Sequence, residues 1–283
     1  MRQWTIDAFA AGPFLGNAAC VLEPFDLWPP DAWMQSLAAE NGAGATGYLL
    51  RTGAANRFGL RWFTPATEVP LCGHATLAAA HALRVEQGLD EPQFAFETAS
   101  GDLIATAVGD DRYELSFPRP AARRIATPAG LADALGAKPA EVWAGPYLVA
   151  RFDDAGTIAR LDPRYDDLRR ISERLGGQGN VGVVALATEG APHDVVDRFF
   201  APGYGLREDP ATGSFHAILV PIFAERLPSR PIRFRQACPG RGADFEGRLE
   251  GERVVLRGRA VTVMESRLRT SAGAGSDEVL HLT

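Results

Sequence analysis

Two short stretches of the 283-residue chain hold side chains that could move protons. One contains Cys72 and His74, and the other contains Asp209, Thr212 and Ser214. A thiol, an imidazole and a carboxyl group are side-chain types that act as general acids and bases. Each stretch has the form Pro-x-x-Gly, followed by an apolar run typical of a buried helix. The two stretches therefore indicate a site for proton transfer at the starts of two helices.

The two expected helices begin near Gly73 and Gly213. The first turn of a helix has free backbone N–H groups and a partial positive charge, so it favours carboxylates and phosphates. Two such ends could hold one small anion at a domain interface, where pockets commonly form. Helix capping is the simpler explanation: Thr212 or Ser214 would cap, and Asp209 would bind backbone amides. Capping does not explain the thiol and the imidazole at the matching place, so we favour a site.

Single candidates have alternative interpretations. A helix dipole beside Cys72 would lower the pKa of its thiol and make the thiolate accessible, whereas a free cysteine is equally often a small buried apolar residue. His74 is either a general acid or base, or a partner of a loop carbonyl. His81 lies within the predicted buried helix and is expected to be a core histidine, and His216 stays ambiguous.

Hydrophobic periodicity and turn residues predict an α+β fold of many short strands and two buried helices. The predicted helices cover residues 31–40, 73–87, 168–175 and 213–224. The predicted strands cover residues 4–8, 17–22, 48–51, 58–63, 94–98, 102–108, 112–117, 142–152, 181–187, 195–200, 231–237, 246–250, 253–257 and 260–264.

The two halves of the chain resemble each other. Arg61-Trp-Phe and Arg198-Phe-Phe precede the two Pro-x-x-Gly stretches at similar distances, and this alignment pairs Glu68 with Glu208. Each half has the order strand, loop, Pro-x-x-Gly, buried helix. We therefore expect two similar domains that face each other across a cleft.

The best linker candidate is the proline-containing stretch 118–120. It divides the chain into an N-terminal domain, residues 1–118, and a C-terminal domain, residues 119–283. This division leaves open whether the last strand returns to the first domain.

Composition excludes several classes of protein. A net charge of −6 and no basic stripe argue against nucleic acid or an anionic membrane as a partner. No apolar run approaches a membrane span and the start of the chain is no signal peptide, so we expect a cytoplasmic protein. The only lysine, Lys138, lies in a polar turn, which argues against P-loop and pyridoxal phosphate chemistry. The three cysteines and five histidines fit no zinc motif, so we expect no metal.

Two familiar patterns occur in the wrong context. Gly42-Ala-Gly-Ala-Thr-Gly47 satisfies the GxGxxG pattern of dinucleotide-binding sites, but it follows a predicted helix and precedes a predicted strand, the reverse of the required order. Thr212-Gly-Ser-Phe-His does not fit the GxSxG pattern of hydrolases. We therefore give little weight to a nucleotide enzyme or a hydrolase.

Several stretches together resemble the PhzF-like (phenazine biosynthesis) family of the diaminopimelate epimerase superfamily. They span essentially the whole chain: Asp7-Ala-Phe, Gly16-Asn-Ala, Trp62-Phe-Thr-Pro, Glu68-Val-Pro-Leu-Cys-Gly-His-Ala-Thr, Glu208-Asp-Pro-Ala-Thr-Gly-Ser, Arg235-Gln and Gly258-Arg-Ala-Val-Thr-Val. The resemblance implies two pseudo-symmetric domains, each a curled mixed β-sheet around a central buried helix. It also implies isomerase chemistry in a cofactor-free active site between the domains, commonly in a homodimer.

The resemblance also implies roles for single residues. His74, Asp209 and Ser214 match active-site residues of the family, and Cys72 matches one of the two cysteines that the superfamily's epimerases use. These four are the predicted catalytic residues. The predicted substrate-binding residues stand at the same two helix ends: Gly73, Ala75, Thr212 and Gly213.

This sequence departs from the family at two positions. Ala45 stands where many members have the glutamate that shuttles the proton, and Thr212 stands at the place of the second epimerase cysteine. Neither side chain can replace the missing group, so we expect neither the phenazine-pathway reaction nor two-thiol racemisation.

The leading hypothesis is a cofactor-independent isomerase that shifts a proton on, or epimerises, a small carboxylate metabolite. Asp209 or Cys72 would remove the proton, and His74 would stabilise or reprotonate the enolate. The alternative is a catalytically silent relative that binds a small anion or a protein partner.

Overall fold

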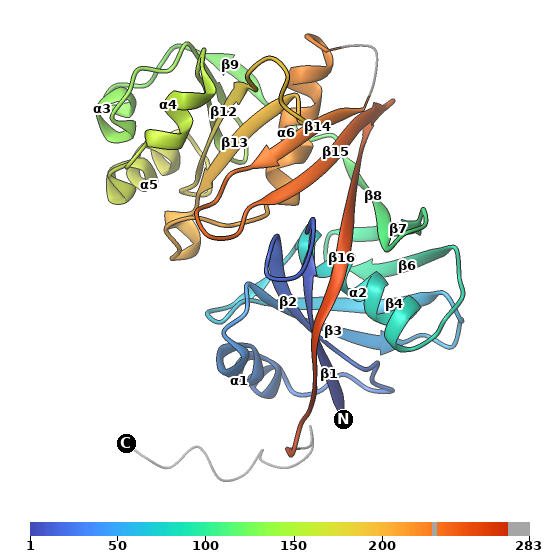
Figure 1. Ribbon diagram of the computed structural model, residues 1–283. Coiled ribbons are helices and arrows are strands. Elements are labelled where there is room, and N and C mark those ends of the chain that lie inside the picture. Colours follow the sequence, from blue (N-terminus) through green and yellow to red (C-terminus); the bar gives the residue numbers. More distant parts are fainter. Residues whose placement is uncertain (228–230, 271–283) are drawn as a thin grey trace, which may run out of the picture.

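A long strand, β16 (Arg253–Arg267), connects two lobes in the computed structural model, which describes residues 1–227 and 231–270. Figure 1 shows the first part of the chain in the lower lobe and most of the remainder in the upper one, with β16 descending from the upper lobe into the lower. Each lobe combines a mixed sheet with few helices, which confirms the predicted α+β class.

The lower lobe is a sheet that closes on itself around a helix. In chain order its elements are β1 (Arg2–Ala8), β2 (Asn17–Leu22), α1 (Asp31–Asn41), β3 (Ala45–Arg51), β4 (Arg57–Phe63), β5 (Glu68–Val69), α2 (Gly73–His81), the π-helix η1 (Ala82–Glu86), β6 (Gln93–Thr98), β7 (Gly101–Ala107) and β8 (Arg112–Pro118). The strand order is β1-β2-β3-β4-β6-β7-β8-β16, and β1 also pairs with β16. Helix α2 packs against β1 and β16, the two strands whose pairing closes the ring. It is buried along its whole length, because its side chains are mostly small or apolar.

The upper lobe also has a mixed sheet with a buried helix, but no strand pairing among the described residues closes this sheet. Its sheet continues from β16 in the order β15-β14-β13-β12-β11-β10-β9, and α6 packs against β14, β15 and β16. Its elements are β9 (Arg123–Ile125), α3 (Leu131–Leu135), β10 (Glu141–Ala144), β11 (Leu148–Arg151), α4 (Ala155–Arg160), α5 (Tyr165–Arg174), β12 (Val181–Leu186), β13 (Val195–Phe200), the 3-10 helix η2 (Pro202–Tyr204), α6 (Gly213–Ala224), β14 (Ile232–Gln236) and β15 (Ala243–Glu250).

The strand pairings reveal how closely the two halves correspond. From β2 to β8 the successive pairs are parallel, antiparallel, parallel, antiparallel and antiparallel, and the pairs from β11 to β16 follow the same sequence. Phe63 pairs with Glu68 in the first half, and Phe200 pairs with Glu208 in the second. The internal repeat that the sequence predicts is thus present in the backbone.

A single continuous strand, β16, replaces the two strands predicted at 253–257 and 260–264. The predicted gap between these strands, residues 258–259, is absent, and Gly258 in it has a packing role. A Cβ atom there would lie 2.2 Å from the ring of Phe9. The missing side chain leaves room for that ring, and the strand runs on without a turn.

Other predicted boundaries also differ from the structure. The predicted helix 73–87 is an α-helix only to His81, and the remainder is the π-helix η1. The predicted strand 142–152 is two strands, β10 and β11, separated by a turn that contains Gly145 and Pro146. The short elements β5, β9, α3 and α4 were not predicted, because elements of two to six residues carry little periodicity.

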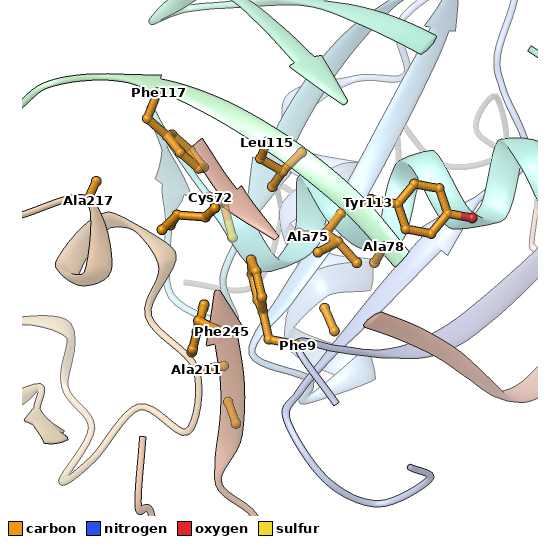
Figure 2. Close-up of a cluster of buried hydrophobic side chains, with 14 of the residues drawn as sticks. Phe9, Cys72, Ala75, Ala78, Tyr113, Leu115, Phe117, Ala211, Ala217 and Phe245 are labelled. Carbon is orange, nitrogen blue, oxygen red and sulfur yellow. The ribbon is translucent and has the colours of Figure 1, made fainter. Parts of the chain in front are cut away.

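One apolar core cluster draws on both lobes. Phe9, whose backbone is left-handed, stacks on Phe245 with ring centroids 4.2 Å apart. Figure 2 shows these rings among Cys72, Ala75 and other small or aromatic side chains from both halves of the chain. The contact fixes the starts of α2 and α6 relative to each other, because both helices pack into this cluster.

Candidate active site

The N-termini of α2 and α6 meet at Gly73 and Gly213. A Cβ atom on Gly73 would lie 3.5 Å from the Cα atom of Gly213, and a Cβ atom on Gly213 would lie 3.6 Å from the Cα atom of Gly73. Their predecessors, Cys72 and Thr212, occupy the N-cap positions of the two helices. The fold therefore places the two Pro-x-x-Gly stretches next to each other.

Asp209 lies shortly before α6, and its carboxyl group has two hydrogen-bond donors. Asn17 donates from Nδ2 to Oδ1 (2.7 Å), and Thr212 donates from Oγ1 to Oδ2 (2.6 Å). The capping interpretation is wrong for Thr212, because its hydroxyl bonds to this carboxyl rather than to an amide of α6. Burial raises the pKa of Asp209 to about 6, although both hydrogen bonds lower it. The carboxylate is therefore a stronger base than that of an ordinary aspartate.

Asn17 connects Asp209 with His74. Its Nδ2 atom also lies 3.5 Å from Nδ1 of His74 and 3.3 Å from the carbonyl oxygen of Ala211. An amide nitrogen only donates, and one of its two protons goes to Asp209. The other lies between the carbonyl oxygen of Ala211 and Nδ1 of His74, which favours the tautomer of His74 that is protonated at Nε2. Asn17 is almost fully buried at the start of β2. Sequence reasoning did not select it as a site residue, although it stands in one of the stretches that resemble the family.

The α2 end presents two neutral groups. Burial lowers the pKa of His74 to about 4, so the imidazole is uncharged at pH 7. Burial also raises the pKa of Cys72 to about 12, against a lowering contribution from the backbone N–H of Ala75. Of the two interpretations of Cys72, this favours the small buried apolar residue over the accessible thiolate, because desolvation outweighs the helix end. The thiol sulfur lies 3.5 Å from Nδ1 of His74.

Gln236, the last residue of β14, holds the turn that carries Asp209. Its Nε2 donates to the carbonyl oxygen of Asp209 (2.5 Å), and its Oε1 accepts from the backbone N–H of Thr212 (2.8 Å). The side chain is fully buried, so both bonds are shielded from water. Gln236 was noted only as part of the family resemblance, and its positioning role follows from the fold alone.

Ser214 belongs to a different set of hydrogen bonds. Its Oγ lies 2.9 Å from the hydroxyl of Tyr147, a buried residue in the turn before β11. Sequence reasoning missed Tyr147, and no pattern around it signals a site. The site therefore has a group around Asp209 and His74 and a second group around Ser214.

Ala45 is the first residue of β3 and is fully buried. Its neighbour Gly44 lies directly against Asn17, since a Cβ atom on Gly44 would be 2.5 Å from Asn17 Oδ1. The position that the family resemblance assigns to a glutamate thus adjoins the site, and Ala45 supplies only a methyl group there.

The two ambiguous histidines have structural partners. Nδ1 of His81 lies 3.2 Å from the hydroxyl of Tyr113, inside the core as expected. His216 lies behind the α6 end, with Nδ1 2.9 Å from the carbonyl oxygen of Thr212 and Nε2 3.2 Å from a carboxyl oxygen of Asp197. Both rings are buried, and their hydrogen-bond partners are not candidate catalytic side chains.

Two surface cavities, of about 460 and 370 Å³, are lined by neither the candidate catalytic nor the candidate binding residues. Cys72 and His74 are each only 8% exposed, whereas Asp209 and Ser214 are half-buried. Within residues 1–227 and 231–270, no group of three or more His, Cys, Asp or Glu side chains is placed to hold a metal ion. No helix in these ranges has both the length and the apolar character that crossing a membrane requires.

Two curled mixed sheets, each around a buried helix, with the two helix ends in contact, define an epimerase-like fold. Solved structures agree: a protein of the PhzF family from Enterococcus faecalis is 32% identical, with a TM-score of 0.85 over 94% of this chain and 99% of that one. A predicted epimerase from Pseudomonas aeruginosa, 24% identical, shares the fold with a TM-score of 0.74 over 95% of this chain and 99% of its own.

Sequence comparison gives the family. The family described as phenazine biosynthesis-like protein matches residues 6–266, so the chain belongs to it. An uncharacterized isomerase of Pseudomonas aeruginosa is 39% identical over 269 residues, which cover 94% of this chain and 97% of that protein. The family resemblance in the sequence is thereby confirmed, and the named relatives support an isomerase type of enzyme.

Proposed function

We propose that this protein is a cofactor-independent isomerase that shifts a proton on a small carboxylate metabolite, with Asp209 as the base. The observation that carries the proposal is the group around Asn17. It connects a carboxylate whose pKa is raised to about 6 with a neutral imidazole, beside two helix N-termini that touch.

Asp209 starts the reaction by taking a proton from a carbon atom next to the substrate carboxylate. The C–H bond breaks, its proton goes to an oxygen of Asp209, and the electron pair moves into the conjugated carboxylate. The protonated Asp209, which is half-buried, exchanges this proton with water and then delivers a proton to another carbon of the same conjugated system. A base with a pKa near 6 suits this double role, because it is ionised at pH 7 and still a useful acid once protonated.

His74 stabilises the intermediate without changing its own charge. Its pKa of about 4 keeps the ring neutral, and in the tautomer that Asn17 favours the proton lies on Nε2. A neutral N–H donor aimed at developing negative charge lowers the barrier in a site with little water. The first-turn amides at Gly73 and Gly213 supply further donors to the substrate carboxylate, with Ala75 and Thr212 beside them.

A second candidate function is a silent relative that binds a small anion or a protein partner. Ala45 favours it, because a methyl group stands where many relatives have the proton-shuttling glutamate. The two functions share the helix ends and differ only in whether Asp209 takes a proton from carbon.

Deuterium exchange decides between them. The protein is incubated in D₂O with a panel of small amino, hydroxy and unsaturated carboxylic acids, and mass spectrometry follows deuterium in each acid. Asp209→Asn is the test variant, and Asp162→Asn, at a carboxylate exposed on the surface, is the matched control. We expect exchange in the wild type and in the control, and none in Asp209→Asn.

Full exchange in Asp209→Asn would remove Asp209 as the base. Acids that raise the melting temperature of the wild type without exchanging any proton would identify the silent binding protein instead.

A further inference from the structure

A chain of hydrogen bonds leads from Ser214 to the surface. The hydroxyl of Tyr147 lies 2.9 Å from Oγ of Ser214 and 2.8 Å from the hydroxyl of Tyr204. Tyr204 donates in turn to Oε1 of Gln178, at 2.9 Å. No step of the proposed proton transfer uses these hydrogen bonds, yet one end of the series is Ser214, in the first turn of α6.

These hydrogen bonds all donate in the same direction, from Ser214 toward Gln178. Each hydroxyl has one proton, and the proton of Tyr204 is given to Gln178. The bond between the two tyrosines must therefore use the proton of Tyr147. With that proton used, Tyr147 can only accept from Ser214, so the proton of Ser214 points to Tyr147 and away from any ligand.

The surroundings of Tyr147 favour this arrangement. Its side chain is only 5% exposed, and its ring meets Phe199 edge-on with centroids 4.9 Å apart. Burial raises the pKa of its hydroxyl, which keeps the proton that the chain needs. A buried hydroxyl that lost both partners would be costly, so the ring and its bonds hold Oγ of Ser214 in one orientation.

We infer that Tyr147 is a positioning residue that presents Ser214 to the ligand as a hydrogen-bond acceptor, and that the preferred ligand therefore carries an N–H or O–H donor near its carboxylate. This inference rests on the proposed site at the helix ends and narrows its substrate class to hydroxy or amino carboxylic acids. An unsubstituted acid of the same length leaves the acceptor of Ser214 without a partner.

Matched acids test the inference by binding alone. Lactate, alanine and propionate form one set, and malate, aspartate and succinate form another. Within each set the hydroxy acid differs from the unsubstituted acid only in a neutral donor, and the amino acid carries a charged one. Dissociation constants are measured by calorimetry. We expect the wild type to prefer a donor-bearing acid by about five- to tenfold, the size of one hydrogen bond to a neutral partner. Hydroxy and amino members of a set distinguish the two kinds of donor.

Tyr147→Phe removes the acceptor for the proton of Ser214, and this proton is then free to turn toward the ligand. We expect the preference for a donor-bearing acid over the unsubstituted acid to fall to about twofold or less. The affinity for the unsubstituted acid should not change. Ser214→Ala removes the acceptor itself and should give the same loss. A preference that survives both variants would overturn the inference.

Gln178 offers a test that a merely structural role of Tyr147 would not affect. Its side chain is exposed, so changes there should not disturb folding. Gln178→Glu keeps an acceptor for Tyr204 and should retain the preference. Gln178→Lys offers only a donor, reverses the chain and should weaken the preference. Equal behaviour of these two variants would contradict the proposed direction.

Failure of the inference and failure of the proposed function give different results. Deuterium exchange without any donor preference keeps the isomerase and removes the role of Tyr147. A donor preference without exchange keeps the role of Tyr147 and removes the isomerase.

Discussion

The N-terminal ends of α2 and α6 have the same backbone arrangement, but the side chains beside them differ in charge. Both begin at a glycine after an N-cap residue and follow equivalent strands. At pH 7, however, the α6 end has the carboxylate of Asp209, whereas Cys72 and His74 at the α2 end are neutral. The repeated fold supplies two equivalent places, and burial together with Asn17 gives one the base and the other the neutral donor.

Two equivalent ion pairs, one in each lobe, also differ in their surroundings. Arg61 pairs with Glu68 in the lower lobe, and Arg198 pairs with Glu208 at the equivalent place in the upper lobe. The lower pair is partly exposed, with 24% and 40% of its side chains accessible, whereas the upper pair has 8% and 9%. Equivalent residues thus act in different dielectric surroundings, which is how a symmetric fold produces unequal halves.

The largest effect on the rate of deuterium exchange is expected at the start of α6, where Asp209 is charged. Asp209→Asn removes the base, so deuterium exchange into the best acid of the panel should fall by about 10³-fold or more, within the range of one acid–base group. Rates are measured by mass spectrometry, with Asp162→Asn as the control. A fall of less than tenfold would mean that the α6 end does not supply the base.

The two ion pairs should differ strongly in their effect on stability. Arg198→Ala leaves the carboxylate of Glu208 buried without its partner, and the free energy of unfolding should drop by about 3–5 kcal/mol. Arg61→Ala breaks the more exposed pair and should cost about 1 kcal/mol or less. Urea unfolding followed by circular dichroism measures both. Equal losses would show that the two lobes shield their ion pairs to the same extent.

A smaller effect on the exchange rate is expected at the start of α2, where His74 is neutral. His74→Gln keeps an N–H donor but moves it, so kcat for exchange should fall by about 10²-fold, with little change in KM. Steady-state exchange kinetics separate the two constants. A rise in KM with kcat unchanged would make His74 a binding residue rather than a stabiliser of the intermediate.

The smallest effect is expected for Cys72. Its thiol has a raised pKa and stays protonated, so Cys72→Ala should change the exchange rate by no more than about threefold. Cys20→Ala, at another buried thiol, is the matched control. Loss of exchange in Cys72→Ala alone would show that the α2 end carries a reacting group and that the division between the two ends is wrong.

The sequence predicted much of the fold because the repeat is visible in residue types. The helix starts at Gly73 and Gly213, the strand 17–22 and the equivalence of Glu68 with Glu208 all depend on local patterns or on matching stretches. The gap predicted at 258–259 was wrong, because the ring that packs against Gly258 comes from Phe9, far away along the chain. The domain boundary at 118/119, the homodimer and the cytoplasmic location stay predictions.

The chemistry of the site was only partly predictable. Residue types indicated Cys72, His74 and Asp209, but protonation depends on burial, which one sequence does not give. The two interpretations of Cys72 could not be distinguished from the sequence for that reason. Tyr147 and Gln236 reach the site through long-range pairing of strands and turns, so no spacing in the sequence announces them.

The pH profile of kcat/KM for exchange tests the central claim, that the carboxylate of Asp209 is the base. The base works only when ionised, and its pKa is raised to about 6, so the rate should rise as pH increases through 6 and level off above pH 7. His74 is already neutral above its pKa of about 4 and adds no step in this range. A half-maximal rate near pH 4, or a rate that is still rising above pH 8 as a thiol ionises, would contradict the account.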